Sequence, residues 1–169
     1  FQLNQLYFKD TQFASLITWR IFNVLLIANP YDAFMLEDDG RIEEKIFNEY
    51  TSLSLRYPPR FTQVSTVEEA MAQLASRSYD LIIYMPGTGE NEGFEVAHQI
   101  KLQFEHIPMV ILTPFSHGIT QRIAHVDLTP FEYVFCWLGN TDLLVSIIKL
   151  IEDKMNLEHD IKEVGVQMI

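Results

Sequence analysis

The sequence has very few cysteines and no long apolar run. Cys136 is the one cysteine among 169 residues, so no disulfide can form within the chain, and we expect a reducing, cytoplasmic compartment. The longest apolar runs, such as residues 109–112, are far too short to cross a bilayer. The N-terminal residues include Gln and Asn where a secretion signal needs basic residues and a long apolar region. These absences argue against a disulfide-rich secreted protein and against a membrane protein.

Basic residues are also scarce. There are 12 Lys and Arg against 23 Asp and Glu, which gives a formal net charge of -11. Nucleic acids and anionic membranes are polyanions that repel such a chain, so we expect neither as a partner. Solubility is a sufficient explanation of the negative charge, and we prefer it to a partner that specifically recognises acidic groups.

Motifs for metal-dependent and nucleophilic chemistry are missing. The histidines, at positions 98, 106, 117, 125 and 159, do not have the spacing of metal ligands, and the sequence has no HExxH motif and no nucleophile elbow. The loop from Gly87 to Gly93 has the pattern GxGxxxG instead of GxGxxG, lacks the lysine of a P-loop, and carries two glutamates that would repel a pyrophosphate. We therefore expect no cofactor, no metal and no enzymatic activity in these residues.

Five short apolar segments alternate with helical patterns. The expected strands are residues 21–28, 61–64, 79–85, 107–113 and 131–136. The expected helices are residues 35–55 with an interruption at 39–40, one that begins at the capping-box pattern 66–69, one from residue 93, a weak one at 116–124 and a strongly periodic one at 142–155. This alternation predicts an α/β fold, a doubly wound five-stranded parallel sheet in the order 2-1-3-4-5 with helices on both faces.

The two ends of the chain differ from this central pattern. Residues 1–20 form an N-terminal extension with a short helix that Asp10 or Thr11 could cap, and residues 21–155 form the domain. Residues 156–169 combine a charged linker with an apolar run that we interpret as the start of a following domain; the alternative is that this tail packs back on the domain. Because the chain begins at Phe1 and not at Met, we expect a fragment of a longer protein.

The third apolar segment carries the most informative pattern. Residues 79–85 form a short buried strand followed by Pro86, a glycine-rich loop and the helix start Gly93-Phe94-Glu95. This order closely resembles the middle of a response-regulator receiver domain, and the resemblance covers residues 22–154. Receivers have a flavodoxin-like fold and belong to bacterial two-component signal transduction and phosphorelays. In that family the strand ends on an aspartate that accepts a phosphoryl group, and here that position is Met85.

The same resemblance places the other groups of the receiver site. The two acids that help to hold Mg²⁺ after the first strand correspond to Ala28 and Asn29, and the hydroxyl residue after the fourth strand is Thr113. The lysine after the fifth strand corresponds to Cys136, and Tyr133 matches the aromatic residue that the family uses as a rotamer switch. Without acids or lysine nothing offsets phosphoryl charge, so the resemblance implies a degenerate pseudo-receiver that cannot be phosphorylated in the usual way.

Several residues near this site leave alternatives open. The acids Asp32, Glu90 and Glu92 could gather there and bind a cation, although we favour solvated loop carboxylates. We interpret Cys136 as a small core residue in preference to a reactive thiol. Trp137 and Leu138 either form an exposed apolar interface, on the face that receivers commonly use to dimerise, or Trp137 fills the emptied pocket.

Three functions follow from these observations. The first is a non-catalytic signalling module that acts by contact with other domains of its chain, with a protein partner, or with a second copy as a homodimer. The second is a phosphorylatable receiver that uses the displaced acids, and the third is a small-molecule sensor. Residues 30–37 and 135–140 also resemble the N-terminal receiver-like domain of large bacterial proteins described as phosphoenolpyruvate synthase-like. That resemblance implies that any enzymatic phosphotransfer belongs to another part of a longer chain.

Overall fold

The computed structural model describes residues 19–37, 42–53, 55, 57–86, 92–114, 127–137 and 142–164. The helices expected near the N-terminus and at residues 116–124 lie outside these ranges, as do Glu90, Leu138 and the apolar tail after Val164. Within the described ranges, no helix combines the length and the apolar character needed to cross a membrane.

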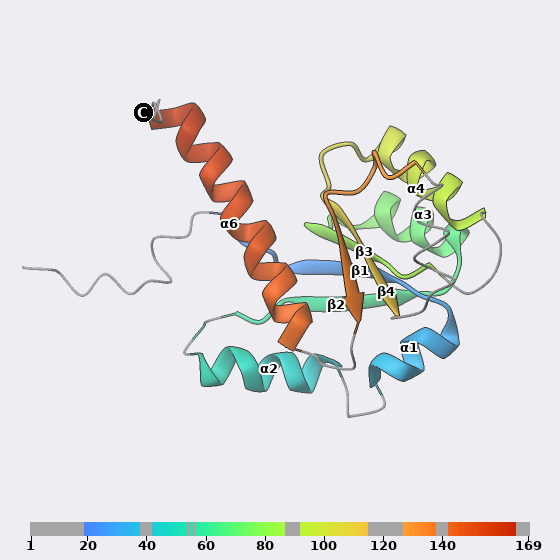
Figure 1. The fold of residues 1–169 in the computed structure, drawn as a ribbon, viewed down its shortest axis with the longest axis horizontal. Coiled ribbons are helices and arrows are strands. Elements are labelled where there is room, and N and C mark those ends of the chain that lie inside the picture. The colour runs from blue at the N-terminus through green and yellow to red at the C-terminus, as the bar shows by residue number, and fades with distance from the viewer. Residues whose placement is uncertain are drawn as a thin grey trace, which may run out of the picture.

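The centre of the molecule is a five-stranded parallel sheet. Its strands are β1 (Asn23–Ile27), β2 (Arg60–Val64), β3 (Leu81–Tyr84), β4 (Met109–Pro114) and β5 (Tyr133–Trp137). They lie in the order β2-β1-β3-β4-β5, and every neighbouring pair is parallel (Figure 1). This confirms the predicted strand order. The central strands are apolar at every position because both of their faces are covered, as the adjacent Leu25 and Leu26 show with 0% and 1% exposure.

Helices cover the two faces of the sheet in separate groups. They are α1 (Pro30–Glu37), α2 (Ile42–Ser52), α3 (Val67–Ser76), α4 (Glu92–Gln103) and α6 (Asp142–Val164). One buried cluster joins Leu26 and Ile83 of the sheet to α1, α2 and α6. A second cluster joins Leu25 and Ile82 to α3 and α4. Successive strand residues point to opposite faces, so the two clusters are the two sides of one sheet.

The first helix begins earlier than the sequence pattern indicated. In place of one interrupted helix at residues 35–55, the chain forms α1 directly after β1 and then α2. Asn29 begins α1 because its side-chain Oδ1 accepts the backbone N–H of Asp32 at 2.8 Å, and its carbonyl accepts the N–H of Ala33 at 3.0 Å. Pro30 follows at the first helical position, where its missing N–H has no cost. The pair Asn29-Pro30 therefore both ends the strand and starts a helix.

The last helix continues past the point where we expected a linker. α6 ends at Val164 and not at Met155, so residues 156–164 are helical. Their charged side chains remain compatible with a helix, and Lys154 and Glu158 form an (i, i+4) pair at 3.9 Å. The buried cluster includes Ile151, with Met155 packed against it. The C-terminal part of α6 projects away from the sheet (Figure 1).

Candidate functional site

The candidate site lies at the carboxyl edge of the sheet, where parallel α/β folds place their ligands. The chain brings four of the expected positions together there. The N–H of Met85 donates to the carbonyl of Ile27 at 2.8 Å, so the ends of β3 and β1 are adjacent, and Ala28 follows directly. Thr113 of β4 is paired in register with Cys136 of β5. Backbone pairing therefore places Ala28, Met85, Thr113 and Cys136 on four successive strands of one edge.

Two of these positions belong to the hydrophobic core. Ala28 is 1% exposed and Met85 is 4% exposed, and both are members of the buried cluster on the side of α1, α2 and α6. A methyl group and a thioether offer no charged ligand to a cation and no nucleophilic oxygen. Because an ionised group at such a place would lose its hydration, the apolar residues stabilise this edge better than unpaired carboxylates would.

Asn29, which the resemblance aligns with the second acid of a receiver, serves the local structure. Besides capping α1, its side-chain Nδ2 donates to Oδ2 of Asp32 at 2.6 Å. Both polar atoms of the Asn29 amide are therefore engaged with Asp32. These hydrogen bonds fix the orientation of the Asn29 side chain, so it is not free to turn towards a metal ion.

Asp32 lies in the first turn of α1, shortly after the end of β1. It is 7% exposed, so the expectation of a solvated loop carboxylate is wrong for this residue. Burial raises the pKa of its carboxyl group, and the hydrogen bond from Asn29 partly opposes that rise. The loop interpretation failed because α1 begins at Pro30 and carries Asp32 into its first turn. The side chain of Glu92 lies outside the described part of the chain, as does Glu90.

The described residues contain no group of three or more His, Cys, Asp or Glu side chains that could hold a metal ion. Asp32 is a single carboxylate that already accepts a hydrogen bond from Asn29. Divalent magnesium takes several oxygen ligands, commonly from one or two carboxylates together with water and phosphate oxygens. Among the described residues, Asp32 is the carboxylate that lies near the end of β1.

The thiol of Cys136 faces solvent, so the prediction of a small core residue is wrong. β5 is the edge strand of the sheet, and its residues alternate between partly buried and exposed. Tyr133, Phe135 and Trp137 pack against the cluster beneath α6, and Cys136 points to the other face. Thr113, its neighbour on β4, is 6% exposed.

Tyr133 and Thr113 are not side by side. The register pairs Tyr133 with Val110, three residues before Thr113 along β4. Lys154 of α6 lies over the Tyr133 ring, with Nζ 5.6 Å from the ring centre, and the ring of Phe135 is 5.9 Å away. The aromatic residue that matches the switch position is thus held against α6.

Trp137 packs against the buried cluster that contains Ala28 and Met85. It is partly buried and pairs in register with Pro114 at the end of β4. Whether Trp137 fills a pocket at this edge or contributes to an interface stays a prediction. Leu138, the second residue of the expected interface, lies outside the described residues.

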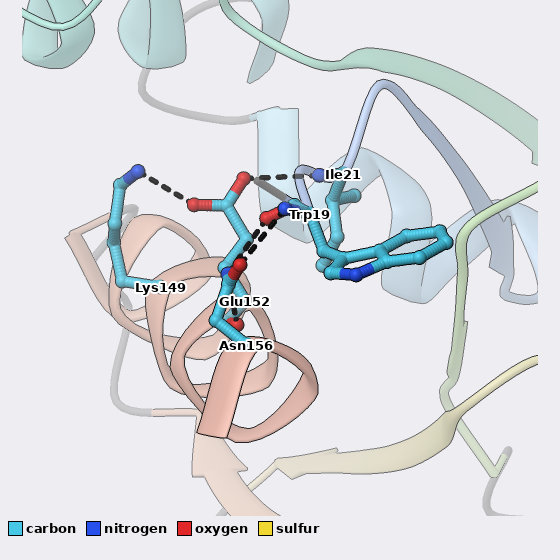
Figure 2. A network of polar contacts seen from close by, with 5 residues as sticks. All are labelled: Trp19, Ile21, Lys149, Glu152 and Asn156. Carbon is cyan, nitrogen blue, oxygen red and sulfur yellow. Dashed lines mark hydrogen bonds and ion pairs between the residues drawn. The ribbon is translucent and has the colours of Figure 1, made fainter. Parts of the chain in front are cut away.

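Sequence reasoning missed a second polar centre, on α6. Glu152 is 2% exposed, and Figure 2 shows its carboxylate between Lys149 and the backbone of Ile21. Asn156, one turn further along the helix, contacts Trp19. The available signal was the position of Glu152, next to Ile151 and four residues after Ile148, at the border of the buried apolar face of α6. A glutamate there has to be paired when the helix packs.

Comparison with solved structures identifies the fold. A CheY-like receiver domain protein from Methanospirillum hungatei is 13% identical, with a TM-score of 0.57 over 82% of this chain and 98% of that chain. The response regulator TrrA from Thermotoga maritima, in complex with Mg²⁺-BeF, is 21% identical, with a TM-score of 0.51 over 76% and 97%. The phosphorylated cyanobacterial phytochrome response regulator RcpA is 23% identical, with a TM-score of 0.54 over 80% and 93%.

No protein-family model and no curated protein sequence matches the chain. The structural likeness therefore establishes a receiver fold, with the order 2-1-3-4-5, at identities of 13–23%. It covers nearly the full length of each of these receiver structures.

Proposed function

We propose that this chain is a non-catalytic, receiver-like module of a signalling or regulatory protein, a pseudo-receiver that acts by protein contact and not by phosphorylation. The observation that carries the proposal is the burial of Met85 at the end of β3, at 4% exposure, next to the equally apolar Ala28. This edge is where a receiver fold would hold its phosphoryl group.

The chemistry of phosphoryl transfer explains why these residues matter. A covalent phosphoaspartate needs a carboxylate nucleophile, and the charge of the transferred group has to be stabilised by a metal ion or a fixed cation. The methyl group of Ala28, the thioether of Met85 and the thiol of Cys136 supply none of these. The resemblance to phosphoenolpyruvate synthase-like proteins stays a prediction, and it would assign any phosphotransfer to another part of a longer chain.

Incubation with Mg²⁺ and a small phosphodonor, such as acetyl phosphate, is expected to leave the intact mass of the protein unchanged. The reason is that the site offers no carboxylate nucleophile where a receiver has one. Intact-protein mass spectrometry provides the measurement, and an active receiver treated in parallel provides the positive control. The addition of one phosphate to an aspartyl side chain would contradict the proposal.

One observation favours a second candidate, a receiver that uses a displaced acid. Asp32 is buried close to the end of β1 and has a raised pKa, which is a common property of functional carboxylates. The variant Asp32→Asn distinguishes the two candidates in the same experiment. If a phosphate is added to the wild type and not to Asp32→Asn, the displaced-acid function replaces the pseudo-receiver.

The contact surface that we assign to this module is on α6. Leu150, Leu157 and Ile161 are 39%, 60% and 42% exposed, and we name them the apolar stripe. With Lys154 at the one polar position, they recur at alternating steps of four and three residues. Leu143 and Ile147 continue this spacing towards the start of α6, but they pack in the core of the domain. Isoleucine and leucine at alternating positions of a heptad favour a parallel pair of identical helices. The proposed occupant of the stripe is therefore a second copy of the chain.

The variant Leu157→Glu is expected to abolish self-association, because a carboxylate would be buried between two apolar helices. We expect its dimer dissociation constant to exceed that of the wild type by more than about a hundredfold. Sedimentation velocity over a concentration series provides the measurement. Leu102→Glu is the matched control, since Leu102 is 86% exposed on α4. A wild type that stays monomeric at high concentration, or equal effects of the two variants, would exclude this interface.

A further inference from the structure

The N-terminal end of the described chain is bound along one side of α6. Residues 19–21, which we name the strap, lie against Glu152 and Asn156 (Figure 2). The N–H of Trp19 donates to Oδ1 of Asn156 at 2.8 Å, and Nδ2 of Asn156 donates to the carbonyl of Trp19 at 2.9 Å. The N–H of Ile21 donates to Oε1 of Glu152 at 3.0 Å. Two side chains on the helix thus bind three backbone groups of the strap.

The geometry of this contact is periodic on both sides. Two residues of an extended chain span about 6.6 Å, and four residues of an α-helix rise about 6 Å. The two distances are similar, so Trp19 can bind Asn156 while Ile21 binds Glu152. The hydrogen bonds of the strap are made by its backbone atoms, so they depend on the backbone conformation of residues 19–21 and not only on their side chains.

The strap contacts the helix beyond the part that the core supports. Ile151 is a member of the buried cluster, and Met155 packs against it. Asn156 and His159 come later along α6, and the ring of His159 lies 5.9 Å from that of Trp19. Figure 1 shows this part of the helix projecting from the sheet.

The strap and the apolar stripe lie on opposite sides of α6. At about 100° per residue, His159 is about 160° from both Leu157 and Ile161 around the helix axis. The strap can therefore hold the helix without covering the stripe. Ordering of the backbone on one side fixes the positions of the side chains on the other side.

We infer that the strap keeps residues 156–164 helical, and that the strap thereby controls whether the apolar stripe is available to a partner. When the strap is drawn away, the helix loses the two hydrogen bonds between Trp19 and Asn156 and the ring contact with His159. The end of a helix that has lost its tertiary contacts frays. The inferred order of α6 stands on these contacts alone, whereas control of the interface rests on the proposed function.

The variant Asn156→Ala in the chain of residues 1–169 tests the first part. Amide hydrogen exchange of residues 157–164 is expected to become about tenfold faster, which corresponds to the loss of about two hydrogen bonds of ordinary net strength. Alanine is a better helix former than asparagine, so propensity alone would make exchange slower. Asp153→Ala is the matched control on an exposed position of the same helix and should not accelerate exchange.

A second measurement follows the strap itself. The chain has two tryptophans, Trp19 and Trp137, so the substitution Trp137→Phe in both proteins leaves Trp19 as the fluorescent reporter. Asn156→Ala should shift its emission to the red as the strap separates from α6. Unchanged or slower exchange of residues 157–164 overturns the inference, whether or not the emission shifts.

Exchange is measured at a concentration where the protein is monomeric, which separates this inference from the dimer. The dimer dissociation constant of Asn156→Ala is then compared with that of the wild type and is expected to rise about tenfold, in proportion to the loss of helix order. Faster exchange would support the role of the strap in holding α6. If the dissociation constant were then unchanged, or if no dimer formed, the strap would not control the interface.

Discussion

Replacement of Met85 by aspartate is expected to destabilise the protein by about 3–4 kcal/mol at pH 7, since it places an unpaired charge in a site that excludes water. Met85 is 4% exposed, and its neighbours in the cluster are apolar residues of β1, β3 and α6. An aspartate at Met85, the position that the resemblance aligns with the phosphorylated residue of receivers, is therefore expected to conflict with these apolar surroundings. Urea unfolding at constant salt measures the loss, with the slope checked for two-state behaviour.

The control for this experiment is Met85→Leu, which conserves volume and should cost less than about 1.5 kcal/mol. The difference between the two variants should shrink as the pH falls. Burial raises the pKa of an introduced carboxyl group above its value in the unfolded chain. The folded state then favours the protonated form, so stability is retained at low pH and is lost as the pH rises through the folded-state pKa.

Mg²⁺ should not rescue Met85→Asp. In a receiver the metal shares its charge among several carboxylates, but here the positions after β1 are Ala28 and Asn29, and Asn29 is engaged as the cap of α1. If Met85→Asp were as stable as Met85→Leu at pH 7, or if Mg²⁺ restored its stability, the edge would still hold a usable cation site. The proposal of a pseudo-receiver would then fail at its structural basis.

The sheet was the part of the molecule that the sequence predicted best. Each strand is a short apolar segment bounded by polar or turn-forming residues, and a parallel sheet covered on both faces needs this pattern. The positions of Ala28, Met85, Thr113 and Cys136 at one edge followed from the strand order. The positions at that edge depend on which strands pair, and the strands themselves can be recognised from the apolar segments of the sequence.

The features that the sequence did not predict depend on tertiary contacts or on helix ends. Asp32 is buried because Asn29 and Pro30 start a helix at once, whereas the sequence pattern predicts a helix only from residue 35. Cys136 is exposed because β5 is an edge strand that is packed mainly on one face. The C-terminal part of α6 is mostly charged and polar, and its apolar residues Leu157 and Ile161 are too few to indicate a helix by periodicity alone.

The strap shows the same limit most clearly. Its contacts with α6 are made mainly by backbone atoms of Trp19 and Ile21, which any residue except proline could supply at position 21. They join residues that are more than a hundred positions apart, 131 in one case and 137 in the other. A pattern of residue types cannot predict such long-range pairing. The one local indication was Glu152, at the border of the buried apolar face of α6.

Glu152→Ala is expected to cost about 3 kcal/mol of unfolding free energy, the second large effect. The glutamate is 2% exposed, and its two oxygens accept from the N–H of Ile21 at 3.0 Å and from Nζ of Lys149 at 2.7 Å. Removal leaves a buried N–H without its acceptor and a void in place of the side chain. Lys149 contributes less to the loss, because its side chain is 28% exposed and its charge can reach water.

Glu152→Gln separates these contributions. A glutamine keeps an oxygen for the N–H of Ile21 and gives up the ion pair, so we expect a loss of about 1 kcal/mol. Asp153→Ala, an exposed substitution on the same turn, should stay within about 0.5 kcal/mol of the wild type. Equal losses for Glu152→Gln and Glu152→Ala would assign the effect to the charge and not to the contact with the strap.

Tyr50 provides an independent readout of the same substitution. Its ring is 3% exposed, its hydroxyl has no hydrogen-bond partner among the described residues, and Nζ of Lys149 lies 5.4 Å from the ring centre. Burial raises the pKa of Tyr50, and the carboxylate of Glu152 raises it further. Glu152→Ala and Glu152→Gln both remove that charge, so both should lower the pKa of Tyr50 in an absorbance titration. A Tyr50 pKa that is unchanged in both variants would show that the Glu152 carboxylate does not act on α2, and would confine its role to the strap and Lys149.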